Sequence, residues 1–182
     1  MPADSLMADQ TRCGSVAHML SELIEGVGSV AIVGVGDDHP RPPSPSAWDD
    51  WGDMDPAAKD IDLERWIIEL TGGGQTQTVG DLSAHTVRYG PTTSSRAVSI
   101  GVSLVEEFRG RRIGVVAQRL LAELLHDRGI VRVEASTDVE NVAEQRALER
   151  AGFAYEGTLR LAQGRRDGLH DLQVWSHVRP PA

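Results

Sequence analysis

The sequence predicts an α/β fold in which a mixed, mostly antiparallel sheet is flanked by helices. Two observations predict this class. From residue 76 onward, the segments follow the order strand, strand, helix, strand, helix, strand, strand. At both ends of this series, neighbouring strands are joined by connectors rich in glycine and polar residues, as in antiparallel hairpins. A length of 182 residues fits one compact domain spanning 1–182.

Runs of β-branched and apolar residues mark the strands of the series. The first pair, Val79 to Tyr89 and Ala97 to Leu104, is separated by the turn-forming residues 90–95. Ile130 to Ala135 predicts a third strand. Phe153 to Leu161 and Leu169 to Val178 predict a closing hairpin.

The most regular helical pattern precedes the third strand. Its apolar residues recur at i, i+3, i+4, i+7, i+8 and i+11, namely Ile113, Val116, Ala117, Leu120, Leu121 and Leu124. His126 and Arg128 lie in the last turn, and Gly129 follows as a C-cap. A shorter helix begins after Asn141 and ends before Gly152, with three residues on its inner side: Val142, Leu148 and Ala151.

The first 75 residues form a divergent N-terminal part, distinct from residues 76–178. Helical spacing predicts one helix over Ser15 to Leu23 and another over Ile61 to Leu70, closed by Gly72, Gly73 and Gly74. Between them, Val30 to Val35 predicts a strand. The proline-rich stretch 37–46 predicts a surface loop, because prolines lack the amide donor that a helix or central strand needs.

Composition limits the classes of partner. A net charge of −9 disfavours nucleic-acid binding, because phosphate contacts need a basic surface. No apolar run reaches the length of a membrane span, and no secretory signal opens the chain, so a soluble cytoplasmic protein is expected. Cys13 cannot form an internal disulfide and is assigned no role. No metal site is predicted.

The turn from Phe108 to Val115 places glycines and arginines at the start of the long helix. The first turn of a helix has unpaired amides and a positive dipole end, which together bind anions. A connector whose arginines face water is an equally good interpretation of this segment alone.

Two further segments favour the anion site. Together with residues 109–114, the Asn-led segment 141–153, which ends in Glu-Arg-Ala-Gly-Phe, and the Glu-Gly-x-x-Arg segment 156–160 resemble the GNAT superfamily of N-acetyltransferases. The resemblance covers roughly 79–178. It is closest to the branch that contains the ribosomal-protein N-terminal acetyltransferases, and it implies a GNAT-like sheet and acetyl-coenzyme A (acetyl-CoA) as co-substrate.

The resemblance also implies a cofactor site. The family turn holds the CoA pyrophosphate, the preceding strand pairs with pantetheine, and the asparagine lies beside the pantetheine arm. Carried over by position, these residues are Val102, Ser103, Leu104, Arg109, Gly110, Arg111, Arg112, Ile113, Gly114, Val115 and Asn141. Arg112 stands where the family pattern has its first glycine. Its side chain either hinders close approach or supplies a direct contact to phosphate.

Acyl transfer to an amine needs a group that removes a proton from the nucleophile. Glu134 is the first candidate, with His85 and Asp81 behind it, and each also fits an exposed strand residue. The acids expected from the family are absent, because Leu148 and Glu144 occupy their positions. Asn141 and Glu144 have the spacing of a capping box, which is a structural explanation for Glu144.

The function predicted is transfer of an acetyl group to a primary amine of a protein N-terminus or a small, cationic molecule. Three alternatives stay open: a non-catalytic domain that binds CoA, a domain that binds a protein partner, and an acyltransferase that uses another acyl-CoA. A homodimer is also an open alternative.

Overall fold

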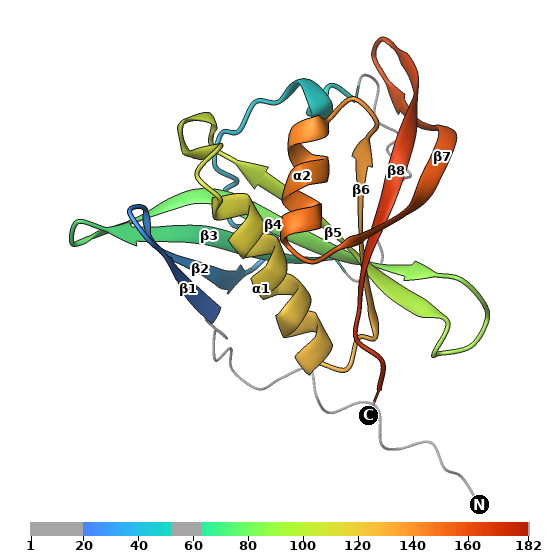
Figure 1. The fold of residues 1–182 in the computed structure, drawn as a ribbon, viewed down its shortest axis with the longest axis horizontal. Coiled ribbons are helices and arrows are strands. Elements are labelled where there is room, and N and C mark those ends of the chain that lie inside the picture. The colour runs from blue at the N-terminus through green and yellow to red at the C-terminus, as the bar shows by residue number, and fades with distance from the viewer. Residues whose placement is uncertain (1–19, 52–62, 182) are drawn as a thin grey trace, which may run out of the picture.

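The computed structural model describes residues 20–51 and 63–181. Within them, eight strands form one sheet in the order β1-β2-β3-β4-β5-β6-β8-β7 (Figure 1). Every neighbouring pair is antiparallel except β5 and β6, which are parallel. The predicted fold class is therefore confirmed. The strands are β1 Leu20–Ile24, β2 Gly28–Val35, β3 Glu64–Gly72, β4 Gln75–Arg88, β5 Arg96–Leu104, β6 Arg132–Asp138, β7 Ala154–Arg165 and β8 Gly168–Val178.

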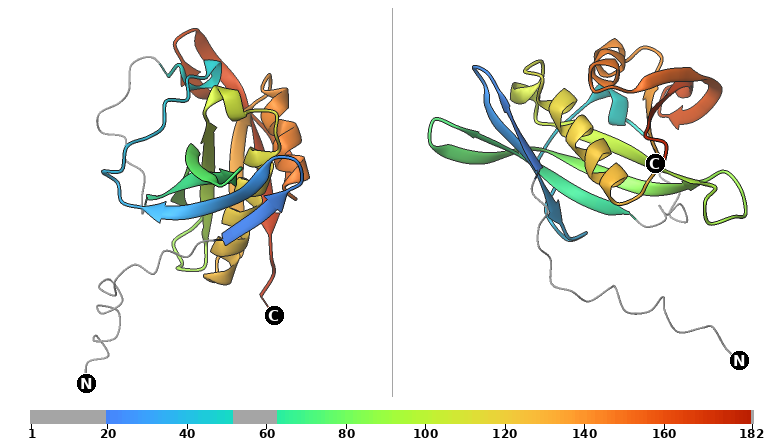
Figure 2. Two further views of the ribbon diagram at one scale, coloured as in Figure 1. Left: turned by 90° about the vertical axis from the view of Figure 1, so that its left-hand side faces the viewer. Right: turned by 60° about the horizontal axis from the view of Figure 1, so that its bottom comes forward.

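Two helices, α1 (Ile113–Asp127) and α2 (Val142–Arg150), lie on one side of the sheet (Figures 1 and 2). The helical spacing buries one face of α1 against the sheet, so Ile113, Leu121 and Ala117 are fully enclosed. On the strands, Ile68, Leu82 and Val133 belong to the same core cluster. Among the described residues, neither helix is long and apolar enough to cross a membrane.

The predicted helix boundaries are confirmed in the C-terminal half. Gly129 takes a φ of 85° directly after α1, and its amide donates to the carbonyl of His126 at 2.9 Å, as a C-cap does. In α2, Leu148 and Ala151 face the core as expected, but the inward placement of Val142 was wrong. Val142 is the first residue of α2 and is 47% exposed.

The first predicted helix was wrong where the structure describes it. Residues 15–19 lie outside the described residues, and Leu20–Ile24 form strand β1. This segment forms a hairpin with β2, with Leu20 opposite Ile32, through a turn that contains Gly26 at a φ of 72°. Leu23, counted as part of an apolar helix face, is 74% exposed. Strand pairing with a buried neighbour overrides the local helical spacing.

The second predicted helix was also wrong. Residues 61 and 62 lie outside the described residues, and Glu64–Gly72 form strand β3 between β2 and β4. Trp66, Ile67 and Ile68 are all buried, so both faces of this strand are covered. A strand buried on both faces shows a continuous apolar run, whose pattern does not distinguish it from a buried helix.

The proline-rich loop is confirmed as irregular and largely exposed over residues 37–46. It lies on the side of the sheet away from α1 and α2 (Figure 2). Arg65 on β3 holds it there, because its Nη1 donates to the carbonyls of Asp37 at 3.0 Å and His39 at 2.9 Å. The sheet is thus covered by helices on one face and by this loop on the other.

Candidate functional site

The parallel strands β5 and β6 separate toward their carboxyl ends. They are paired only from Val98 to Ile100 on β5 and from Val133 to Ala135 on β6, although they continue to Leu104 and Asp138. The peptide groups that face the gap beyond Ile100 therefore have no partner on the adjacent strand. This opening at the edge where both helices begin is the main feature of the site.

The turn before α1 lies beside the opening. Gly110 has a φ of 74° and Arg112 a φ of 66°, so both adopt the left-handed conformation. Among the described residues, no side chain caps the first amides of α1, which leaves the N–H groups of residues 113–115 available to an anion. Gly114 lies against the end of β5, since a Cβ there would come within 3.3 Å of a Leu104 methyl group.

The three arginines of the turn have different surroundings. Arg109 connects the turn to its neighbours, because its Nε donates to the Leu104 carbonyl at 3.0 Å and its Nη2 to the Pro45 carbonyl at 2.8 Å. Arg111 stacks on the ring of Phe108, with 5.4 Å from guanidinium carbon to centroid. Arg112 is exposed at the helix start. The turn is thus held in place mainly by Arg109.

The remaining predicted cofactor residues line the same edge. Val102, Ser103 and Leu104 are partly buried on the part of β5 that pairs with β4 but not with β6, and the Ser103 hydroxyl bonds that of Ser44 in the proline-rich loop. The side chain of Ile113 is fully buried, so only its backbone faces the turn. Asn141 caps α2 as predicted, its Oδ1 accepting from the Glu144 amide at 3.2 Å.

Glu144 does not complete the predicted capping box. The amide of Asn141 donates to the Asp138 carbonyl at 3.0 Å instead of to the Glu144 carboxyl. Glu144 is half-buried, and burial of its carboxyl raises its pKa to about 7, against a smaller lowering by a hydrogen bond with Gln118. Leu148 is fully buried in the core.

The three candidate bases share the face of the sheet opposite the helices. His85, Ser99 and Glu134 lie in one cross-strand row, so His85 and Glu134 are two strand spacings of about 4.8 Å apart. Asp81 lies further along β4 opposite Ser103, with Arg41 of the loop at 3.7 Å. The structure thus brings two of the candidates into one row, with the third closer to the turn.

Glu134 belongs to a network that the sequence did not predict. Its two carboxylate oxygens accept from the Tyr89 hydroxyl at 2.8 and 2.7 Å. Glu134 also pairs with Arg132, and Arg132 in turn forms a bidentate salt bridge with Glu156. Arg132 lowers the pKa of Glu156 to about 2. Burial, followed by the bond to Glu134, raises the pKa of Tyr89. Only the i, i+2 spacing of Arg132 and Glu134 on one strand face signals this network in the sequence.

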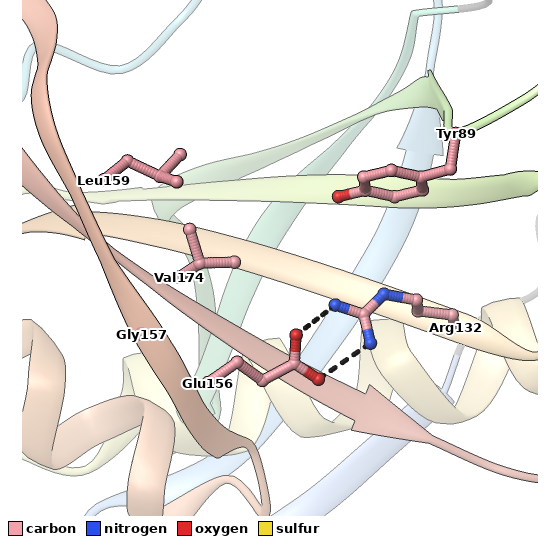
Figure 3. A pocket seen from close by; sticks show the side chains of 6 residues that line it. All are labelled: Tyr89, Arg132, Glu156, Gly157, Leu159 and Val174. Atoms are coloured by element: carbon pink, nitrogen blue, oxygen red, sulfur yellow. Dashed lines mark hydrogen bonds and ion pairs between the residues drawn. The ribbon is translucent and has the colours of Figure 1, made fainter.

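A cavity of about 460 Å³ lies beside this network (Figure 3). Val174, part of its wall, pairs with Ser136, the first residue of β6 beyond the parallel segment. Val174 thus brings one wall of the cavity next to the opening, while Tyr89 belongs to another part of the lining. Its lining combines an aromatic, an ion pair and aliphatic groups: Tyr89, Arg132, Glu156, Gly157, Leu159 and Val174.

A family model described as an acetyltransferase (GNAT) domain matches residues 33–154. The match covers more than half of the chain, which belongs to this family. The predicted family is therefore confirmed. A search of curated proteins found no match.

Solved structures of the family share the fold. Mycobacterium smegmatis RimJ in complex with a CoA disulfide is 23% identical with a TM-score of 0.54, over 64% of this chain and 53% of that chain. RimL, a ribosomal L7/L12 α-N-protein acetyltransferase in complex with CoA, is 24% identical with a TM-score of 0.54. This match covers 64% of this chain and 62% of that chain. The microcin C7 self-immunity acetyltransferase MccE, in complex with acetyl-CoA and AMP, is 24% identical with a TM-score of 0.54. This match covers 64% of this chain and 61% of that chain. The match spans between about half and two thirds of these chains.

Proposed function

We propose that the protein transfers an acetyl group from acetyl-CoA to a primary amine. The opening between β5 and β6, beside the uncapped amides of α1, is the observation that carries this proposal. The peptide groups of residues 101–104 that face away from β4 are available to the pantetheine arm, and the amides of residues 113–115 to the pyrophosphate. Family membership and the solved complexes of RimL and MccE support the same donor.

The amine is proposed to reach the thioester from the face opposite the helices. That face carries the row of His85, Ser99 and Glu134, and the cavity at Tyr89 adjoins the opening. An amine with a pKa near 10.4 is mostly protonated at neutral pH, so it must lose a proton before attack. We assign this role to Glu134, with His85 in the same row as the alternative.

The acceptor class is a protein N-terminus or a small amine. RimL is described as acetylating a ribosomal protein N-terminus. The cavity of about 460 Å³ is large enough for an amino-acid side chain. The apolar part of its wall, Leu159 and Val174, suits the carbon skeleton of such a residue.

An amine panel tests the proposal. The protein is mixed with acetyl-CoA and with peptides of varied N-terminal residue or small amines, and thiol release is followed together with product mass. We expect at least one amine to gain one acetyl group, and propionyl-CoA and longer donors to react more slowly. Failure of every amine and donor would contradict the proposal and favour a domain that binds CoA without turnover.

A further inference from the structure

Residues 44–51, which we call the strap, connect the two edges of the opening. At the end of β5, the Ser44 hydroxyl bonds that of Ser103, and the Pro45 carbonyl accepts from Arg109 Nη2 at 2.8 Å. The other end of the strap contacts the hairpin of β7 and β8, and β8 is the neighbour of β6. The strap thus extends from the β5 edge of the opening to the β6 edge.

Two arginines of the hairpin hold the second end of the strap. The backbone amide of Arg166 donates to the Asp50 carbonyl at 3.1 Å, and its Nε donates to the Asp50 carboxylate at 2.8 Å. The guanidinium carbon of Arg165 lies 5.5 Å from the ring centroids of both tryptophans of the strap. The same guanidinium lies 3.6 Å from the carboxylate of Asp138, the last residue of β6. Arg165 therefore connects the strap to the edge of the opening.

A bulge separates the tip of this hairpin from its base. The register of β7 and β8 shifts between Leu159 and Gln163, and Leu161 within this interval has a φ of 53°. A leucine in the left-handed region is strained, and the Asp171 carboxylate holds its amide at 2.8 Å. Beyond the bulge, the strands of the tip are paired from Gln163 and His170 to the turn. The tip can therefore move without the base, which forms the cavity wall.

His170 fastens the tip to β6. Its Nδ1 lies 2.7 Å from the Asp138 carboxylate, and its Nε2 lies 2.9 Å from the carboxylate of Asp167 in the turn. A neutral imidazole has one N–H, so only the imidazolium donates to both carboxylates. The third charged group here is Arg165, which shares Asp138. The bond to Asp167 raises the pKa of His170, burial opposes this, and the bond to Asp138 raises the pKa further.

Loss of this proton loosens the turn. The carboxylate of Asp138 is fully enclosed, so the remaining N–H of His170 stays on Nδ1, where it satisfies that carboxylate. The lone pair of Nε2 then faces Asp167, which is 74% exposed and can turn to water. Asp167 directly follows Arg166, which holds Asp50. The turn is therefore released at the point where it binds the strap.

We propose that protonated His170 is a latch that keeps the strap closed over the opening, and that loss of its proton releases the strap and admits the acceptor amine. The role in acceptor entry rests on the proposed acetyl transfer. The latch is closed below the ordinary histidine pKa of about 6.5 and opens as pH rises through the higher pKa of the folded protein. An amine loses its proton in the same direction, so entry and nucleophilicity of the acceptor rise together.

The latch acts on a local equilibrium. The hairpin lies at one end of the sheet, so its tip can open while the core stays folded. His170 and Asp167 are both partly exposed, so their bond contributes little to global stability. Release is therefore followed by hydrogen exchange of the strap and the tip.

Amide hydrogen exchange between about pH 6 and 9, corrected for the intrinsic rate and read by mass spectrometry, tests the latch. In the parent, opening of residues 47–51 and 162–170 should increase about three- to fivefold over this range. His170→Gln should be open at every pH, because glutamine carries no charge. Asp167→Asn should stay closed at every pH, because the new amide donates to the neutral ring. His39→Gln, at an exposed position, is the control and should keep the parental dependence.

Kinetics with an amine from the panel test the role in acceptor entry. The ratio of kcat/KM between His170→Gln and the parent cancels the ionisation of the amine, which is the same in both. We expect a ratio of about three- to fivefold at about pH 6.5 and a ratio close to one at about pH 8.5. A ratio that does not change with pH would overturn the role in acceptor entry.

The exchange experiment decides on the latch separately from the proposed function. A parental pH dependence in His170→Gln, or exchange in the parent that does not change with pH, would overturn the latch. A parent that acetylates no amine would overturn the proposed function and the role in acceptor entry, whereas exchange alone decides whether His170 closes the strap.

Discussion

At the scale of single residues, Arg112 explains how the chain departs from its family pattern without losing the turn. A side chain in the left-handed conformation is costly, and glycine is the residue that avoids this cost. Arg112 nevertheless adopts a φ of 66°, so the turn keeps the shape that a glycine would give it. The sequence left open whether an arginine fits this position of the turn, and the backbone conformation of Arg112 shows that it does.

Replacing Arg112 by glycine distinguishes the backbone strain at this position from the contribution of its positive charge to CoA binding. Arg112→Gly should raise the free energy of unfolding by about 0.5–1 kcal/mol, because it removes the left-handed strain. If the guanidinium also contacts a phosphate, CoA binding should weaken about tenfold at the same time. Urea denaturation and calorimetry measure the two effects, with Arg112→Ala as the control that removes charge but keeps the strain. A less stable Arg112→Gly protein would show that the conformation is not strained.

Glu134 is tested by its pH dependence. Glu134→Gln should lower kcat/KM by about a hundredfold at neutral pH, and the deficit should shrink at alkaline pH, where the amine is already neutral. Glu149→Gln, at an exposed position of α2, is the control, because it removes a carboxylate outside both the row and the cavity. Parental rates across the pH range in Glu134→Gln would transfer the role to His85 or Asp81.

At the scale of elements, the segments with local signals were predictable and those fixed by pairing were not. The apolar spacing of α1, the Asn141 cap and the glycine after each helix are local, and all three were confirmed. The residues of β1 and β3 show helical spacing, but they form strands because each pairs with β2, which lies between them. The candidate site also has one part with a local sequence signal and one part fixed by strand pairing. Its turn was predictable, while the network of Tyr89, Glu134 and Arg132 depends on strand pairing.

A histidine pair links the end of α1 to β8. His126 Nε2 and His177 Nδ1 are 2.8 Å apart, and His126 Nδ1 lies 2.7 Å from the Ile130 carbonyl. Burial, then the charges of His126 and Arg179, lower the pKa of His177, while Glu123 opposes them. A hydrogen bond between the two rings needs one ring nitrogen without a proton, so the contact favours neutral histidine.

The stability of the protein should therefore fall in acid. Because the folded pKa of His177 is lowered, its contribution is complete above the unfolded value of about 6.5 and is lost as pH falls through the folded value. Urea midpoints measured between about pH 7.5 and 5.5 should decline in the parent and decline less in His177→Phe. His39→Gln, at an exposed position, is the control. Equal slopes in all three proteins would contradict this account.

At the scale of the whole molecule, the segment that follows the proline-rich loop, residues 47–51, contacts the hairpin of β7 and β8. The guanidinium carbon of Arg165 on β7 lies 5.5 Å from the ring centroids of both Trp48 and Trp51. Arg166 pairs with Asp50 at 2.8 Å. A few residues earlier in the same segment, the Pro45 carbonyl accepts from Arg109 and the Ser44 hydroxyl bonds that of Ser103. The loop thus connects the proposed cofactor turn to the hairpin that forms the cavity.

The central claim is that the opening and the turn before α1 bind acetyl-CoA. Calorimetry with acetyl-CoA, on the parent and on Gly114→Glu, tests it most directly. Glutamate at this position adds bulk against Leu104 and a negative charge among amides that would bind pyrophosphate. We predict binding of one acetyl-CoA per parental chain and a loss of affinity of at least about tenfold in the variant, whose circular dichroism should stay parental. Equal affinity in the two proteins would contradict the site.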